Sequence, residues 1–419
     1  MSSENRLQWL LMAATNLYLF FLCSTKWNAG YSISLGLVVA AILIYWKRKR
    51  KIAIPVHKVW LWCYGLFMGL IFLAAAASGK TVVMKSAVNF ISYSIPFWVL
   101  VMALQYKRKP IRAYMQWGLW GGTLVLCGAA FHQHVLQNFP VRLQGPFPSP
   151  NNFALALECL LPFLGWLLWD TWKKSSAKWQ WLGVIPFACA GLSLWMTRSR
   201  GGMAGALIGW VMVSAYYWML QRDWNRKRLV AVFLVLLCVV GAGTAFSTIN
   251  LARRKYDAER LLLWKASYAM WMDHPVIGVG FGQWSKEYKA HYILPQAKEP
   301  DLPNPHNNII TFFSTAGFLG GIGYLCFAVG TIMLLLGMLQ KEPENYIAYA
   351  VLWLCLADFI HGMVENTLYS KSTMRIYFAM WGIFLASSIK SWEEGFRQWW
   401  IFFIMSSVQN KPLKDGIKS

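Results

Sequence analysis

Residues 315–339 read TAGFLGGIGYLCFAVGTIMLLLGML, a run without a charged side chain. A helix needs about 20 apolar residues to cross the ~30 Å hydrocarbon core of a bilayer, so this run predicts a transmembrane helix. Similar runs recur along the chain, which is 57% hydrophobic and only 14% charged. The sequence therefore predicts an all-α, polytopic bundle of about a dozen spans, near residues 8–25, 29–46, 59–77, 81–105, 113–131, 151–170, 180–197, 201–219, 229–248, 315–339, 346–363 and 373–390.

The basic residues indicate how these spans are oriented. The formal net charge is +23, which in a soluble protein would suggest nucleic acid. Among so many apolar runs, anionic membrane lipid is the better explanation, and we expect no nucleic-acid partner. Clusters of Lys and Arg fall between alternate spans, and the positive-inside rule places them in the cytoplasm together with both termini. These clusters are Lys47–Lys51, Lys107–Lys109, Lys173–Lys178 and Arg222–Arg228.

This orientation divides the chain into four parts. Residues 1–248 hold the first nine spans, and residues 249–314 form a large outward loop with short helices. Residues 315–392 hold the last three spans, and residues 393–419 form a cytoplasmic tail. The outward loop is strongly basic against the orientation rule, and although long loops cross the membrane largely regardless of charge, its basicity needs an explanation.

The sequence predicts neither a metal site nor a cofactor. It contains no Walker A loop, no H-E-x-x-H motif, no G-x-S-x-G elbow and no pair of clustered carboxylates. His132 and His134 are one possible metal-ligand pair, but polar surface is the commoner reason for an isolated H-x-H. The eight cysteines are scattered singly through apolar stretches, which indicates packing residues.

The first outward feature with side chains suited to binding or catalysis is Thr197-Arg198-Ser199-Arg200-Gly201-Gly202. Arginines at the end of a span often only place their guanidinium group at the polar membrane surface and have no further function. Here Arg198 and Arg200 lie on the side that the orientation rule disfavours, and a Gly-Gly pair starts the next helix. A helix N-terminus beside a guanidinium group is a suitable phosphate site.

The outward loop supplies the second feature. It opens with Arg253-Arg254-Lys255, which is a candidate anion site or simply a solvated basic surface. A helix is predicted over 257–272, where Arg260, Trp264, Ser267 and Trp271 recur at helical spacing and share a face. We expect this helix to lie along the outer membrane surface. The Gly-rich segment 278–282 is interpreted as a flexible turn near a ligand or as a plain loop.

Pro303-Asn304-Pro305-His306-Asn307-Asn308 is the third feature. Asn304 is a reasonable N-cap and Pro305 suits the first helical position, which would put His306 in the first turn of the helix. The helix dipole there disfavours imidazolium, so a neutral His306 is a candidate general base. The alternative is a boundary histidine that neighbouring groups satisfy.

Acidic residues near the outer end of the 346–363 span form a fourth, weaker feature. Asp358, His361 and Glu365 are spaced three and four residues apart, so we expect them on one helix face. Ionisable residues within a span are functional candidates. Glu365 is expected to orient His306 or to pair with an arginine, and a purely structural ion pair is an equal alternative.

Taken in order, these motifs resemble the O-antigen ligase and polymerase superfamily of bacterial membrane glycosyltransferases of the GT-C type. The resemblance covers roughly residues 190–370. The pieces that carry it are T-R-S-R-G-G at 197–202, R-x-x-x-W at 260–264, D-H-P-V-I-G-V-G-F-G at 273–282, and H-N-N at 306–308 followed by A-G-F-L-G at 316–320.

The resemblance implies an activity and a location. Family members act in lipopolysaccharide biosynthesis at the bacterial inner membrane, with a periplasmic active site and no metal. Their donor is a glycan on undecaprenyl pyrophosphate, and the acceptor is a lipid A-core sugar or another glycan. Carried over by position, Arg200 and Arg260 hold the pyrophosphate with help from Arg198 and Arg254. His306 is then the base, and Glu365 matches the family's acidic residue, with Asp358 as a competitor.

Other functions fit the sequence less well. A polymerase of the same superfamily, which joins lipid-linked repeat units, is not separated from a ligase by these motifs. A transporter of polysaccharide or lipid would be expected to carry broken helices at matching places in two halves, and we find no such pair. A non-catalytic scaffold would not need arginines and a histidine gathered at the outer boundary.

Overall fold

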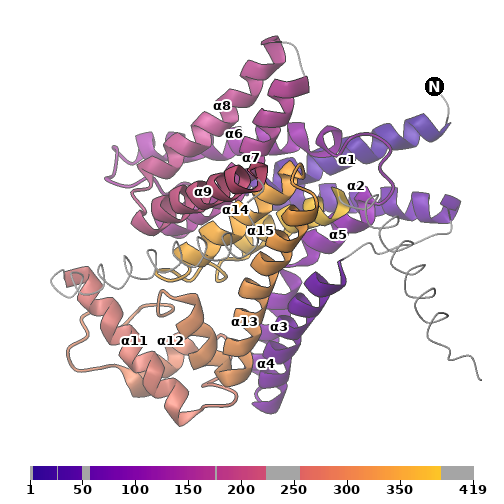
Figure 1. Ribbon diagram of the computed structural model, residues 1–419. Coiled ribbons are helices and arrows are strands. Elements are labelled where there is room, and N and C mark those ends of the chain that lie inside the picture. Colours follow the sequence, from indigo (N-terminus) through magenta and orange to yellow (C-terminus); the bar gives the residue numbers. More distant parts are fainter. Residues whose placement is uncertain (1–2, 26, 50–56, 175–176, 223–254, 388–419) are drawn as a thin grey trace, which may run out of the picture.

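The computed structural model describes residues 3–25, 27–49, 57–174, 177–222 and 255–387, and the regular structure of these residues is entirely helical (Figure 1). In chain order, the first half comprises α1 (Ser3–Ser24), α2 (Asn28–Lys49), α3 (Lys58–Ala77), α4 (Thr81–Ser92), α5 (Ile95–Leu104), α6 (Arg112–Leu136), α7 (Pro150–Lys174), α8 (Ala177–Met196) and α9 (Arg200–Gln221). The second half comprises α11 (Lys255–Asp273), α12 (Trp284–Glu287), the π-helix η1 (Tyr288–Tyr292), α13 (Asn308–Lys341), α14 (Tyr346–His361) and α15 (Lys371–Ser387).

The helices agree with the predicted spans. Each predicted span has a helix at its position, with α4 and α5 sharing the span at 81–105. The exception is 229–248, which lies outside the described residues, as does the predicted tail at 393–419. Within the described residues, 7 helices are long and apolar enough to cross a membrane. The chain is therefore a multi-pass membrane protein.

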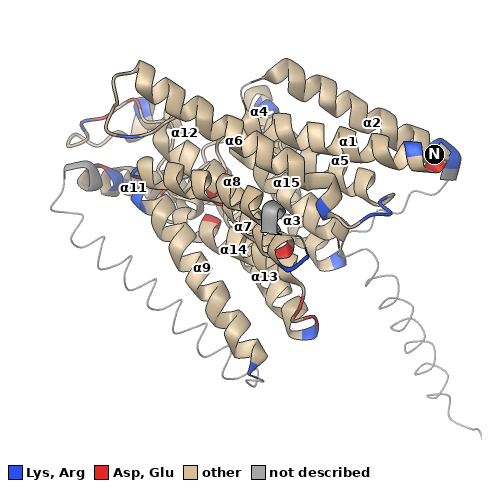
Figure 2. Cartoon of the chain, turned by 90° about the horizontal axis from the view of Figure 1, so that it is seen from above, with Lys and Arg blue, Asp and Glu red and all other residues tan. Residues whose placement is uncertain are grey.

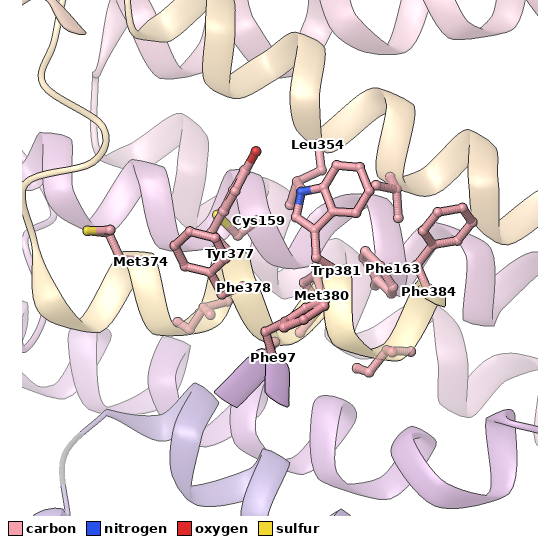
Figure 3. Close-up of a cluster of buried hydrophobic side chains, with 14 of the residues drawn as sticks. Phe97, Cys159, Phe163, Leu354, Met374, Tyr377, Phe378, Met380, Trp381 and Phe384 are labelled. Atoms are coloured by element: carbon pink, nitrogen blue, oxygen red, sulfur yellow. The ribbon is translucent and has the colours of Figure 1, made fainter. Parts of the chain in front are cut away.

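Charge and burial are arranged as a membrane bundle requires. Figure 2 shows Lys and Arg gathered at helix ends and in connecting segments, while the helix surfaces carry few charges. The interior is rich in aromatic side chains. Figure 3 shows Phe97, Tyr377 and Trp381 in one cluster around α15, and all three side chains are buried. Such large, rigid groups fix how the helices pack against one another.

The segment after α9 has a small core of its own. Leu263, Ala266 and Met270 on α11 pack with Val279, Trp284 and Tyr288 from the following turns. The helix predicted at 257–272 is thus present, and its apolar face is buried against α12 and η1. In Figure 1, α11 and α12 lie beside the start of α13, away from α6 and α8.

A break in α13 joins this segment to the bundle. Gly317 has φ +64° and ψ −156°, so the helix is interrupted one residue after Ala316. The turn at 275–280 fills the break, because Val279 N–H donates to the Ser314 carbonyl (3.0 Å) and Phe318 N–H donates to the Pro275 carbonyl (2.7 Å). Gly278, at φ +66°, faces the break. The Gly-rich turn is therefore docked on α13 by its backbone.

Gly317→Ala tests this contact. An added Cβ would lie 2.3 Å from the Val276 carbonyl oxygen, and the positive φ disfavours any side chain. We expect a loss of about 1–3 kcal/mol, seen as a lower melting temperature of the purified protein. Gly337→Ala is the control in the same helix, because nothing lies within 4 Å of its added Cβ. An equal effect of both substitutions would contradict the close backbone packing at Gly317.

Candidate active site

The segment around His306 differs from the sequence prediction in its local structure. Helix α13 begins at Asn308, and its N-cap is Asn307, whose side chain accepts the Ile310 N–H at 3.0 Å. Asn304 is therefore not the helix cap. Its side-chain oxygen instead accepts the His306 N–H at 2.9 Å. His306 precedes the helix with φ +52°, so the helix-dipole argument for a neutral ring does not apply as stated.

Two asparagines fasten this segment to the turn that follows α14. The Asn307 amide donates to the Met363 carbonyl at 2.8 Å, and the Asn308 N–H donates to the Gly362 carbonyl at 2.7 Å. The buried Asn308 side chain also donates to the Thr367 hydroxyl at 2.6 Å and accepts the Thr367 N–H at 2.9 Å. The H-N-N motif thus brings together two segments that lie far apart in sequence.

This docking places His306 against Glu365. The His306 Nδ1 and Glu365 Oε1 atoms are 2.6 Å apart, with 21% of the His306 side chain and 8% of the Glu365 side chain exposed. Helix α14 ends at His361, so Glu365 lies in the following turn. The expectation that Asp358, His361 and Glu365 share one helix face was therefore wrong for Glu365.

Glu365 has hydrogen-bond partners for both oxygens. Oε1 also accepts the Asn366 N–H at 3.1 Å, and Oε2 accepts a hydrogen bond from the Asn151 amide at 2.5 Å. Burial alone would raise the pKa of Glu365, but His306 and Asn151 lower it to about 2. The ionised carboxylate favours a proton on Nδ1 of His306, which leaves Nε2 of the neutral ring as an acceptor.

Asp358 and His361 lie elsewhere. Asp358 is within α14, and His361 at the end of that helix contacts Glu158 of α7, with 2.9 Å between His361 Nδ1 and Glu158 Oε1. Both partners of this pair are buried. The sequence analysis missed Glu158, because a carboxylate inside an apolar run carries no indication of which helix will face it.

The T-R-S-R-G-G turn rests on the Glu158–His361 pair. A Cβ on Gly201 would lie 2.6 Å from His361 Cδ2, and a Cβ on Gly202 would lie 2.5 Å from Glu158 Oε1. The Gly-Gly pair therefore allows α9 to start directly against α7 and α14. Ser199 caps α9 by accepting the Gly202 N–H at 3.3 Å.

The predicted pyrophosphate-binding arginines can be placed in part. Arg198, with φ +49°, and Arg200 at the start of α9 are both exposed. Arg260 is on α11, one turn before Trp264, whose indole N–H donates to the Pro305 carbonyl at 2.9 Å. That contact brings the α11 face with Arg260 to the residue preceding His306. Arg254, with Arg253, lies outside the described residues.

Arg142 and Asn151 are two site residues that the sequence analysis missed. Arg142 Nε donates to the Thr197 carbonyl at 2.9 Å, and its Nη2 donates to the Asn151 side-chain oxygen at 2.6 Å. Burial lowers the pKa of Arg142, and the charges of Arg260 and Arg200 lower it further, while Glu365 opposes them. The positive charges of Arg200 and Arg260 therefore act on Arg142.

The described residues hold no group of three or more His, Cys, Asp or Glu side chains that could bind a metal ion. His134 is buried, whereas its neighbour His132 is exposed. What the site offers instead is a carboxylate–imidazole pair beside several guanidinium groups. Such an arrangement can remove a proton from a hydroxyl group and stabilise an anionic leaving group.

Comparison with known proteins bears on the family of the chain. Residues 185–325 match the family model described as O-antigen ligase, and no curated protein matches the chain. The match starts within α8, contains the T-R-S-R-G-G and H-N-N motifs, and ends within α13. It confirms the resemblance of the chain to the O-antigen ligase and polymerase superfamily, over residues 185–325.

Proposed function

We propose that this membrane glycosyltransferase is an O-antigen ligase. It transfers a glycan from undecaprenyl pyrophosphate to a sugar hydroxyl of lipid A-core, on the periplasmic side and without a metal ion. The observation that carries the proposal is the 2.6 Å contact between His306 Nδ1 and Glu365 Oε1 beside the arginines. A base that is oriented by a carboxylate and adjoins cationic groups suits this chemistry.

His306 is the general base in this mechanism. Its Nε2 takes the proton from the acceptor hydroxyl while the hydroxyl oxygen attacks the anomeric carbon of the donor. The bond from that carbon to the pyrophosphate oxygen breaks, and the electron pair leaves with undecaprenyl pyrophosphate. Attack from the face opposite the leaving group inverts the anomeric centre. Glu365 stabilises the imidazolium that forms.

The arginines stabilise the departing pyrophosphate. Arg200 presents its guanidinium at the N-terminus of α9, where the helix dipole also attracts an anion. Arg260 approaches from α11, and Arg198 and Arg254 add positive charge. A planar guanidinium group can hold two phosphate oxygens at once, which positions the donor as well as neutralising it.

The site then faces the periplasm, with both termini in the cytoplasm. In this arrangement residues 1–248 and 315–392 contribute the membrane spans, and residues 249–314 form the catalytic loop. Helix α13 already begins at Asn308, so its segment before the Gly317 break belongs to the loop. The membrane-embedded part of the donor can then remain in the bilayer while its pyrophosphate reaches the arginines.

His306→Ala tests the base. General base catalysis contributes about 10²–10⁴-fold, so we expect glycan transfer by the purified protein to fall by at least about a hundredfold. His274→Ala is the control, because His274 is exposed and lies outside the site. Near-normal transfer by His306→Ala would refute the proposed site.

A strain without the chain tests the reaction itself. If the chain is an O-antigen ligase, its deletion leaves polymer on the lipid carrier and lipid A-core without polymer. The wild-type chain then restores attachment of the polymer to lipid A-core, and His306→Ala does not. A polymerase, which uses a lipid-linked repeat as the acceptor, would instead leave a single repeat on the core. That lipopolysaccharide profile would identify the chain as a polymerase and would contradict the ligase assignment.

Arg200→Lys tests pyrophosphate binding. Lysine keeps the charge but cannot form the two parallel hydrogen bonds of a guanidinium group. A hydrogen bond to a charged group contributes about 1.5–3 kcal/mol, so we expect transfer to fall about 10- to 100-fold. Arg222→Lys at the opposite end of α9 is the matched control, since Arg222 packs over the Trp218 ring. Equal activity of both variants would exclude two-pronged binding by Arg200.

A further inference from the structure

Asn151 lies between Glu365, the carboxylate that contacts His306, and Arg142. Its amide nitrogen donates to Glu365 Oε2 at 2.5 Å, and its amide oxygen accepts from Arg142 Nη2 at 2.6 Å. A neutral side chain thus bonds to an anion at one end and to a cation at the other. Asn151 is in the first turn of α7, which fixes its backbone relative to both partners.

Without this side chain, Arg142 and Glu365 would be natural partners. A carboxylate and a guanidinium group form a strong two-pronged pair, and both groups are largely removed from water. Arg142 and Glu365 each hydrogen-bond to the same amide group of Asn151, and the Glu365 charge already acts on Arg142. Glu365 would then divide its charge between Arg142 and His306.

From this geometry we propose that Asn151 is a positioning residue, a neutral spacer that keeps Arg142 from pairing directly with Glu365. The proposal rests on the proposed role of His306 as base. The spacer reserves the carboxylate for the imidazole and leaves the Arg142 charge to act with Arg200 and Arg260. The charged and titratable groups that act on Glu365 and Arg142 are His306, His361, Arg200 and Arg260.

The proposal predicts opposite pH effects for two substitutions. In Asn151→Ala, Arg142 moves toward Glu365, so the carboxylate stabilises the His306 imidazolium less. The acid side of the pH–rate profile, where the base becomes protonated, then shifts to lower pH. In Asn151→Asp, a further anion lies next to the pair, the imidazolium gains support, and the acid side shifts to higher pH. We expect shifts of about one pH unit, which correspond to a tenfold change in proton affinity.

The test measures glycan transfer by the full-length chain between pH 4.5 and pH 9, using lipid-linked donor and lipid A-core. The variants are Asn151→Ala, Asn151→Asp and the double variant Asn151→Ala with Arg142→Gln. Removing the Arg142 charge should return the acid side of the Asn151→Ala profile toward its wild-type position. Asn152→Ala is the matched control from the same turn of α7, and its profile should equal that of the wild type.

The outcomes separate this inference from the proposed function. Shifts in opposite directions, with reversal in the double variant, support the spacer. Shifts in the same direction, no shift, or no reversal would overturn it, because a merely structural role moves yield and melting temperature but not the profile in two directions. Retained activity in His306→Ala would instead overturn the base that the spacer serves, whatever Asn151 does.

Discussion

An ionised carboxylate buried at the end of an apolar helix bundle must have a partner for each oxygen, and Glu365 imposes this requirement on the site. An unpaired buried charge costs several kcal/mol, so the groups around it are constrained. His306, Asn151 and the Asn366 N–H meet the requirement from a turn, a helix start and the adjacent backbone. The bundle supplies these fixed positions, and the site depends on them.

Two of the residues assigned to the proposed site have a strained backbone. His306 and Arg198 both have positive φ although neither is glycine, a conformation that costs about 1–3 kcal/mol. Each is held by side-chain hydrogen bonds from its own segment, Asn304 to the His306 N–H and Thr197 to the Ser199 N–H. The strain at His306 and at Arg198 is therefore maintained by short polar side chains next to them in sequence.

The sequence predicted what depends on local pattern. Apolar runs located the spans, and helical spacing located α11. It also identified His306 and Glu365, and it gave their contact, now seen at 2.6 Å, as one of the alternatives for Glu365. It misplaced the helix start at Asn304, because Asn307 satisfies the same capping rule and only the docking on Met363 decides between them. Arg142, Asn151 and Glu158 were missed, since each acquires its role from a partner more than forty residues away or on another helix.

For the proposed base His306, nearby arginines present an electrostatic difficulty, since guanidinium groups disfavour the imidazolium that proton removal creates. The Glu365 carboxylate offsets this effect from the opposite nitrogen of the ring, because its Oε1 lies 2.6 Å from His306 Nδ1. In the proposed mechanism the arginines, Arg200 at the start of α9 and Arg260 on α11, act instead on the leaving group. Stabilising the imidazolium and stabilising the leaving group both require that the Glu365 carboxylate and the arginines do not neutralise each other. In this site the separation is made by one neutral amide, Asn151, which hydrogen-bonds to both Glu365 and Arg142.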